Sequence, residues 1–519
     1  MMRSGVKLFF TLAPILIESI VPCYKKAALF ERLGFPRRQN IDYNGVTIPA
    51  RRGNHVIFNH ADVVRDHQRR NSPSTISSIY SSAALIAGTT VGGGFLALPT
   101  VTSPVGALPA CLCLVLCWTY LTGCALSLSK AIFLLSAQDG FQHIEKLSIF
   151  GVAKISFGDR AGFLAAALYL ILMLATLVAQ LSKIGIIFSF NQAVTSIAIK
   201  PIAITIFSIL MYAVAFAKDR TVNEKLNNIL TTVMVGSFFS LMAMTPLCGL
   251  DLSRWHRSDF SPLLLSAAAT AAGQPWAVPV FLQLLVYTEV VPVVCSRLRD
   301  ERKVRQAILI GSIIPLIMCI IWTLLAIGLV PYSPSNAGLI VDPVDSLMRG
   351  VQTFAGADKA WSFIPPWLLK QSLSALALSA ISTTVIGSLI TISQFLEDLL
   401  ASSSLSIPST SFSPSIKDEK ISERRRTLLR VLSIALPAAV VMAGSKTLYF
   451  AATEFAGAFP VTLLWGLLPT AASLKLASSR THNGKASTLL SKLGYAGEIS
   501  LFLVSIILIV INTYLAIFK

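Results

Sequence analysis

A stretch rich in glycine and threonine interrupts the first long apolar run of the chain. It reads IAGTTVGGGFLALP, and its glycine and threonine positions are Gly88, Thr89, Thr90, Gly92, Gly93 and Gly94. A membrane helix that unwinds halfway exposes N–H groups at one broken end and C=O groups at the other, which suit the carboxylate and the ammonium group of an amino acid. Glycine also permits close helix packing, but three consecutive glycines are more than packing requires. The stretch therefore predicts a broken helix that binds substrate.

A second apolar run, from Ala277 to Lys303, contains two prolines, Pro279 and Pro292, and no glycine. The polar residues between the prolines are Gln283, Tyr287, Thr288 and Glu289. Proline removes a backbone hydrogen bond and bends a helix. An inverted-repeat transporter places a second break five spans after the first, and this run is the sixth. We therefore predict that Tyr287, Thr288 and Glu289 line the same site as the first break.

Two carboxylates, Glu289 and Glu454, fall well inside apolar runs. A charged group at that depth costs about 2.5–3.5 kcal/mol on insertion scales, so it faces the bundle interior, pairs, or stays protonated. Proton symport requires a buried carboxylate that can take up a proton. Glu289, beside the predicted second break, is the first candidate for coupling, with a structural hydrogen bond to the broken backbone as the alternative. Glu454 is the second candidate.

The composition places these residues in a polytopic membrane protein. The chain has 519 residues, 54% of them hydrophobic and 13% charged, and a mean hydropathy of +0.69. A soluble domain averages about 25% charged residues, whereas about 20 apolar residues cross a bilayer as a helix. Eleven spans are predicted, at about 76–99, 105–129, 161–185, 197–217, 227–248, 276–296, 306–330, 367–396, 428–444, 447–470 and 496–518. The predicted fold class is an all-α membrane bundle.

Basic residues are distributed unevenly among the loops. Most Lys and Arg residues beyond position 74 lie in five loops that share one side of the membrane if the N-terminus is inside. The positive-inside rule then places the C-terminus outside. These loops explain the net charge of +18 without a nucleic-acid partner, because no nucleic-acid motif accompanies it. Residues 1–74 form a basic segment, read as a targeting presequence or a cytoplasmic tail, and residues 75–519 form the transmembrane domain.

Five stretches carry a family resemblance. They are Gly88–Gly94 with Ala97-Leu98-Pro99, Val286-Tyr287 with Val290–Val294, Arg305-Gln306 with Gly311–Leu316, Thr383-Thr384 with Gly387, and Ala456-Gly457 with Leu467-Leu468-Pro469. With them the chain, from about 76 to 518, resembles the tryptophan/tyrosine permease family of the amino acid–polyamine–cation superfamily. It is most similar to the plant and algal tyrosine-specific transport protein branch.

The resemblance implies a LeuT-type fold. Two inverted five-helix repeats would occupy about 76–248 and 276–470, with an extra helix at about 496–518. It also implies proton-coupled import of aromatic amino acids, tyrosine or tryptophan, by alternating access around broken helices 1 and 6. The histidine that bacterial members carry in helix 6 is absent here, where the chain reads Leu284-Leu285-Val286-Tyr287-Thr288.

The same resemblance also bears on the identity of the coupling ion. In this fold, hydroxyls on helix 8 that face the helix 1 break can ligate sodium, and Ser382, Thr383 and Thr384 form the candidate ion site. Hydrogen bonding to their own helix backbone is the alternative. We expect a proton as coupling ion, keep sodium as the alternative, and expect no other cofactor and no metal.

Two further polar residues lie in the third span. Gln180 lies near the predicted end of that span beside Lys183, so solvation is expected to explain it. Tyr169 is expected to pack against its neighbours. Both are secondary candidates for the cavity.

The leading prediction is a secondary transporter in the lipid bilayer that carries a small amino acid. A carrier of other neutral amino acids or amines, a channel and a transport-dead sensor are the alternatives. No enzyme is expected, because the spans contain no histidine and only two separated carboxylates. Plant relatives are linked with the plastid (chloroplast) envelope, which the basic start fits, although a plasma or internal membrane fits it too. The oligomeric state is not predicted.

Overall fold

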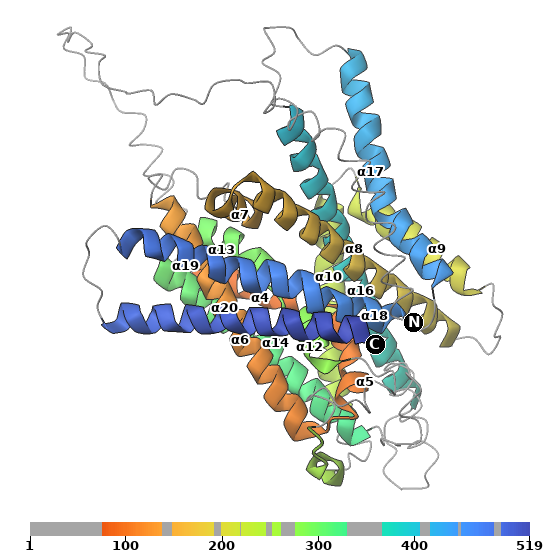
Figure 1. Ribbon diagram of the computed structural model, residues 1–519. Coiled ribbons are helices and arrows are strands. Elements are labelled where there is room, and N and C mark those ends of the chain that lie inside the picture. Colours follow the sequence, from red (N-terminus) through yellow and green to blue (C-terminus); the bar gives the residue numbers. More distant parts are fainter. Residues whose placement is uncertain are drawn as a thin grey trace, which may run out of the picture.

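The computed structural model of the protein is helical apart from one isolated β-bridge between Gly106 and Ser258 in the residues that it describes (Figure 1). These residues are 75–137, 148–190, 199–217, 220–244, 252–260, 276–329, 366–404, 416–444, 448–481 and 489–518. The basic segment 1–74, predicted as a presequence or a tail, lies outside them.

The first half of the chain begins with a broken helix. α4 (Thr75–Thr90) is followed by the 3₁₀ helix η1 (Gly93–Ala97) and by α5 (Leu98–Thr102). The longer helices that follow are α6 (Ala107–Ser136), α8 (Asp159–Phe190), α9 (Ile199–Ala215) and α10 (Arg220–Met244). The short α7 (Ile149–Phe157), between the second and third spans, was not predicted. The Ser148 hydroxyl caps α7 by accepting the Gly151 N–H at 3.3 Å.

The second half also begins with an interrupted helix. α12 (Ala277–Leu285) is followed by the 3₁₀ turn η5 (Thr288–Val290) and by α13 (Val291–Leu298). The helices that follow are α14 (Glu301–Leu329), α16 (Pro366–Ser404), α17 (Ile416–Ala443), α18 (Leu448–Ala456), the π-helix η7 (Gly457–Leu467), α19 (Leu468–Thr481) and α20 (Leu489–Phe518). The short 3₁₀ helix η4 (Leu252–His256) lies between the two halves.

The helices agree with the predicted spans. In the described part of the chain, eight helices are long and apolar enough to cross a membrane, and the bent pair Ser78–Thr90 and Gly93–Thr102 makes a ninth span. Two shorter apolar helices, Pro201–Ala215 and Asn228–Met244, occupy the remaining two predicted ranges. Each of the eleven ranges therefore contains helix in its described residues, and the sidedness of the ends stays a prediction.

The tenth span is longer than predicted. It was expected to end near residue 470, but the helical path continues from Leu448 through η7 to Ser478 and on to Thr481. Two carbonyl groups of the π-helix accept hydrogen bonds from side chains. The Thr462 hydroxyl donates to the Gly457 carbonyl at 2.9 Å, and the Asn512 amide of α20 donates to the Ala458 carbonyl at 2.8 Å. The Asn512 bond joins α20 to the tenth span.

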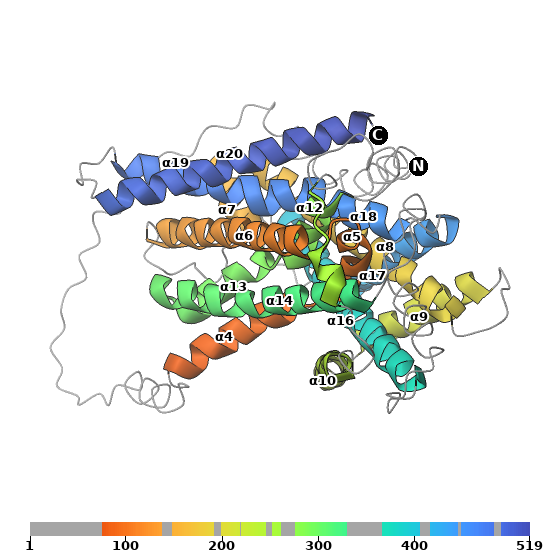
Figure 2. The ribbon, with the colours of Figure 1, turned by 90° about the horizontal axis from the view of Figure 1, so that it is seen from below.

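α20 lies at the periphery of the bundle. Only 11% of its apolar span is buried, against 72% of the tenth span. Its large apolar side chains Leu503, Ile507 and Val510 are exposed. Figure 2 shows α19 and α20 along one edge of the bundle. In a membrane, a continuous apolar face of this kind packs against lipid chains, as expected of an extra helix outside the two repeats.

Candidate functional site

The predicted break in helix 1 is confirmed. α4 ends at Thr90, and the helical path bends by 42° before it resumes at Gly93. Gly92 between the two pieces has an extended backbone, with φ −141° and ψ −171°. The last backbone bond of α4 runs from the Val91 N–H to the Ala87 carbonyl at 3.2 Å. The break therefore frees peptide groups in the interior of a membrane bundle.

Close approach explains why the break contains glycine. A Cβ at Gly92 would lie 2.7 Å from the Thr384 hydroxyl of α16, and one at Gly93 would overlap the side-chain amide of Gln180 in α8. At Gly88, on the α4 side of the break, a Cβ would meet no atom within 4 Å. Two of the glycines therefore allow neighbouring helices to reach the broken backbone, and Gly88 does not serve that purpose.

Hydroxyl groups satisfy the freed peptide groups. The Gly93 N–H donates to the Thr384 hydroxyl at 3.0 Å. The Tyr449 hydroxyl of α18 points at the carbonyls of Gly93 and Gly94, at 3.3 and 3.4 Å. The Thr384 oxygen thus stands where a substrate carboxylate would accept, and the Tyr449 hydroxyl stands where an ammonium group would donate. Thr384 was predicted to face the break, whereas Tyr449 was not singled out.

A buried lysine packs against Tyr449. The side chain of Lys183 is 0% exposed, and its Nζ lies 4.1 Å from the centre of the Tyr449 ring and 5.4 Å from that of Phe450. A desolvated ammonium group over an aromatic face is a cation–π contact worth about 2 kcal/mol or more. This contact places a cation directly behind the hydroxyl that occupies the helix 1 carbonyls.

The expectation that solvation explains Gln180 is wrong. α8 continues to Phe190, so Gln180 and its neighbour Lys183 lie inside the helix rather than at its end, and Gln180 is 4% exposed. The Gln180 Oε1 has no hydrogen-bond donor among the described residues. The apolar sequence IGIIFSF that follows Lys183 is the signal that would have extended the span. A buried acceptor at the break is suited to a polar ligand.

Helix 6 is broken as predicted. α12 ends at Leu285, Val286 is extended with ψ 131°, and α13 begins after the η5 turn. Pro279 lies in the first turn of α12, and Pro292 opens α13, where a missing N–H costs least. The break itself therefore falls at residues 286–287, between the two prolines.

The predicted residues of the second break have different surroundings. Tyr287 is fully buried, and its hydroxyl donates to the Thr122 hydroxyl of α6 at 2.9 Å. Thr288 is also fully buried, and its hydroxyl has no partner among the described residues. Gln283 donates to the Thr176 hydroxyl at 3.2 Å, while its own carbonyl oxygen has no donor there. Tyr287 thus ties helix 6 to α6, and two free acceptors remain.

The two carboxylates lie in different elements of the second half. Glu289, in η5, is only partly buried and forms no ion pair or hydrogen bond among the described residues. It interacts electrostatically with Tyr169 of α8. Glu454, in α18, is 6% exposed and follows Phe450 by one turn, so it belongs to the same α8–α18 interface as Lys183. The two carboxylates therefore differ in burial and in the helices that surround them.

Tyr169 packs as expected. Its ring contacts those of Phe150, Phe395 and Trp465 at 5.4, 5.7 and 6.2 Å between centroids. Its electrostatic contact with Glu289 connects this aromatic cluster to the helix 6 break, which packing alone did not suggest.

The other predicted hydroxyls bond to their own helices. Thr89 and Thr90 both donate to the Ile86 carbonyl, at 3.0 and 2.7 Å. Thr383 and Thr384 both donate to the Ala380 carbonyl, at 3.0 and 2.8 Å. Ser382 is buried. Thr384 alone of these threonines also reaches the helix 1 break, so the structure brings one of the three candidate ion-site residues to it.

Two interrupted helices that meet at a buried polar centre within a membrane bundle define a secondary transporter. A model of the tryptophan/tyrosine permease family matches residues 75–514. The chain therefore belongs to the tryptophan/tyrosine permease family, whose members are integral, multi-pass permeases and not enzymes.

A curated relative is Glutamine transporter 2 of Aliivibrio fischeri (strain ATCC 700601 / ES114). It is 25% identical over 257 residues, which cover 48% of this chain and 61% of the relative. The match thus spans less than two thirds of the relative's length.

Two solved structures are similar over most of the chain. A manganese transporter of Eremococcus coleocola has a TM-score of 0.44 and 12% identity, covering 85% of this chain and 94% of its own. Mhp1, a nucleobase-cation-symport-1 family transporter in a closed conformation, has a TM-score of 0.47 and 14% identity, covering 84% of this chain and 92% of its own.

Proposed function

We propose that the protein is a secondary active transporter that imports aromatic amino acids, tyrosine or tryptophan, by proton symport. The observation that carries the proposal is the state of the helix 1 break. Its N–H and C=O groups are held by two hydroxyls, from Thr384 and Tyr449, and an amino-acid zwitterion can replace both. Rocking of one helix group against the other around this midplane site would then give alternating access.

Aromatic side chains at the break support an aromatic substrate. Phe95, in η1, stacks on Trp322 at 4.9 Å and meets Phe238 edge-on at 5.8 Å between centroids. Aromatic rings favour such stacked and edge-to-face arrangements at 4.5–7 Å. A tyrosine or tryptophan side chain is suited to join this cluster while its zwitterion binds the broken backbone a residue or two away.

Glu289 is the proposed coupling residue, with Glu454 as the second. Proton symport needs a carboxyl group that is accessible in turn from each side and that is not held ionised by a fixed cation. Glu289 is partly exposed at a helix break and has no cationic partner among the described residues. Glu454 shares its interface with Lys183 and is less free to change its charge.

Replacing Glu289 by glutamine tests this assignment. In liposomes with an inward proton gradient, we expect gradient-driven uptake of labelled tyrosine and tryptophan to be lost, because glutamine cannot bind or release a proton. Exchange of internal for external tyrosine without a gradient should persist, because exchange needs no net proton movement. Asp159→Asn is the control, since Asp159 forms an exposed surface pair with Lys154 at 2.9 Å.

The outcomes separate the alternatives. Gradient-driven uptake by Glu289→Gln at the wild-type rate would remove Glu289 from coupling. Uptake that requires sodium would make the hydroxyls of Ser382, Thr383 and Thr384 the ion site instead. If neither amino acid moves under any gradient, the aromatic substrate assignment fails and only the fold and family remain.

A second candidate substrate is a neutral amino acid with a side-chain amide. Three buried acceptors near the two breaks have no donor among the described residues: Gln180 Oε1, Gln283 Oε1 and the Thr288 hydroxyl oxygen. An amide side chain would supply N–H donors to them, and the curated relative is named a glutamine transporter. Competition of unlabelled glutamine against labelled tyrosine decides between the two substrates.

Tyr449→Phe is expected to strengthen substrate binding. The Tyr449 hydroxyl makes two long contacts, at 3.3 and 3.4 Å, with carbonyls that the substrate ammonium needs. Removing it frees both carbonyls and keeps the ring under Lys183. The apparent Kd for tyrosine should fall about fivefold, the factor that a hydrogen bond of about 1 kcal/mol gives. Scintillation-proximity binding measures this, and a weaker affinity would contradict the displacement of Tyr449 by substrate.

The plant and algal tyrosine-specific branch is the proposed subfamily, and the plastid envelope is the proposed location. The motif resemblance supports the first, and the basic segment 1–74 supports the second. A fluorescent-protein fusion at the C-terminus, imaged with and without residues 1–74, tests the location: loss of plastid targeting on deletion supports a presequence.

A further inference from the structure

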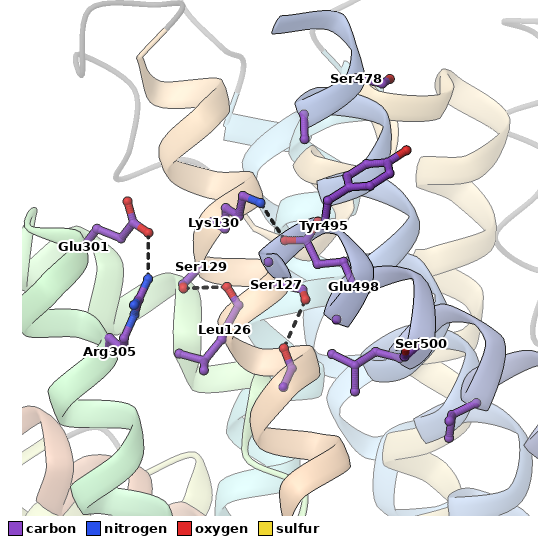
Figure 3. Close-up of a pocket in the computed structure, with 16 residues that line it drawn as sticks. Leu126, Ser127, Ser129, Lys130, Glu301, Arg305, Ser478, Tyr495, Glu498 and Ser500 are labelled. Atoms are coloured by element: carbon purple, nitrogen blue, oxygen red, sulfur yellow. Dashed lines mark hydrogen bonds and ion pairs between the residues drawn. The ribbon is translucent and has the colours of Figure 1, made fainter. Parts of the chain in front are cut away.

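A groove of about 1110 Å³ lies on the outside of the bundle, away from the broken helices. Its walls come from α6, α14, the end of α19, and α20 (Figure 3). It shares no lining residue with the breaks of helices 1 and 6. The proposed transport mechanism does not use it, so it needs its own explanation.

Charged side chains line its polar part. Lys130 of α6 pairs with Glu498 of α20 at 2.7 Å, and Arg305 of α14 pairs with Glu301 at 3.3 Å. Among the described residues each of the two cations makes only this one polar contact, and the side chains of Lys130 and Arg305 are 36% and 61% exposed. Both therefore retain N–H donors for an anion, and Figure 3 shows them on two different helices that line the groove, Lys130 on α6 and Arg305 on α14.

The rest of the wall is apolar and continues into the lipid-facing side of α20. Leu126, Leu501 and Val504 line the groove. Beyond them, Leu503 and Ile507 of α20 are exposed. A ligand that fills this groove therefore meets two ion pairs, whose cations keep free N–H donors, at one end and a hydrocarbon surface at the other, which suits an amphiphile rather than a soluble ion.

The groove lies where the membrane surface is expected. Lys130, Arg305 and the end of α19 each adjoin one of the basic loops that the positive-inside rule places on the inner side. The segment from Arg297 to Arg305 alone contains five basic residues and only Asp300 and Glu301 as acids. The local charge is therefore positive beside an anionic leaflet, a setting in which basic pockets between membrane helices bind lipid headgroups.

We propose that this groove binds an anionic phospholipid. The phosphate would lie between Lys130 and Arg305, and one acyl chain would follow Leu501 and Val504 along α20. The phosphate could in principle come from a soluble phosphate ester as well, but only a lipid uses the apolar wall. The site would fix α20 and α6 to the surrounding bilayer.

Binding of phosphatidylglycerol to the purified full-length protein tests the proposal. In mixed phosphatidylglycerol and phosphatidylcholine nanodiscs, native mass spectrometry should show phosphatidylglycerol enriched on the wild-type protein. Arg305→Gln should lower this enrichment about fivefold, the effect of one basic residue near a membrane surface. The control Arg302→Gln removes the same charge from the same helix at an exposed position that does not line the groove.

A second pair of variants tests the groove itself. A Cβ at Gly497, which lines the groove, meets no atom within 4 Å, so Gly497→Trp should fill it and exclude the lipid without disturbing the core. Gly236→Trp is the control, because Gly236 on α10 is equally open and far from the groove along the chain.

Three results would overturn the proposal. Phosphatidylglycerol enrichment that survives in Gly497→Trp would place the lipid elsewhere. An equal loss of phosphatidylglycerol enrichment in Arg302→Gln and Arg305→Gln would show that the overall positive charge of the loop, and not the groove, attracts the lipid. Displacement of the lipid by millimolar glycerol 3-phosphate would make the ligand a soluble phosphate ester. None of these readouts uses transport, so the test is independent of the proposed function.

Discussion

Replacing Gly93 by alanine is expected to reduce uptake at least about tenfold, because a methyl group at this position enters the space of the Gln180 amide. Gln180 is 4% exposed and has no room to withdraw into solvent. Overpacking of this kind costs about 1–3 kcal/mol. The substitution also moves the Gly93 N–H away from the Thr384 hydroxyl, so the broken backbone loses the geometry in which it would bind substrate.

Gly88→Ala is the matched control for this prediction. Gly88 belongs to the same motif, but a Cβ there meets no atom within 4 Å, and alanine is the better helix former by about 1 kcal/mol. We expect Gly88→Ala to transport normally and to unfold at the same or a higher temperature. Initial uptake rates in liposomes, normalised to folded protein, measure the first, and a thermal unfolding curve of the purified protein measures the second. Equal rates for the two variants would show that the close approach of Gln180 to Gly93 is not required.

The two helix breaks could be predicted because local sequence causes them. Consecutive glycines and the absence of a strong helix former at 92–94 weaken helix 1, and the position of Pro292 starts a new helix after the second break. The hydroxyl of Thr384 was expected at the break and is found there. The position of each break can be predicted from the residues of one helix alone. For Thr384, the side of the second helix that faces the break must also be known.

Tyr449 and Lys183 could not be found in this way. Their roles depend on how α18 crosses α8 and on which side of each helix faces the first break, and neither is encoded within one segment. Gln180 was misread because the third span was expected to end near residue 185, beside Lys183. The helix continues through the apolar residues after Lys183, and the tenth span was also predicted too short.

Side chains of the protein itself occupy the hydrogen-bonding groups of the helix 1 break. A hydroxyl oxygen accepts at Gly93, a phenol donates at Gly93 and Gly94, and an aromatic ring stacks over an ammonium group. In the proposed mechanism, the carboxylate and ammonium groups of the substrate would take the places of the two hydroxyls. The Tyr449 hydrogen bonds are long, at 3.3 and 3.4 Å, so we expect substrate to displace them at little cost, while the free protein avoids leaving buried peptide groups unpaired.

Lys183→Met should lower uptake at least about tenfold, because the cation–π contact that keeps the Tyr449 ring in place once substrate has displaced its hydroxyl is worth about 2 kcal/mol or more. Methionine keeps the length and apolar bulk of the lysine stem, so the core remains filled. It removes the charge that holds the Tyr449 ring, whose hydroxyl lies at the helix 1 carbonyls. It also removes a positive charge from the α8–α18 interface to which Glu454, the second proposed coupling residue, belongs.

Lys154→Met is the control for the loss of a lysine, because the Lys154 amine on α7 is exposed and pairs with the exposed Asp159, and we expect wild-type uptake from it. Measuring uptake against pH distinguishes a positioning role from simple destabilisation. If Lys183 positions Tyr449 and sets the charge of Glu454, Lys183→Met should shift the pH profile of uptake, while the protein still unfolds in a cooperative thermal transition. An unchanged profile with a lowered unfolding temperature would instead mean that Lys183 serves packing alone, since a group without influence on the site cannot move its titration.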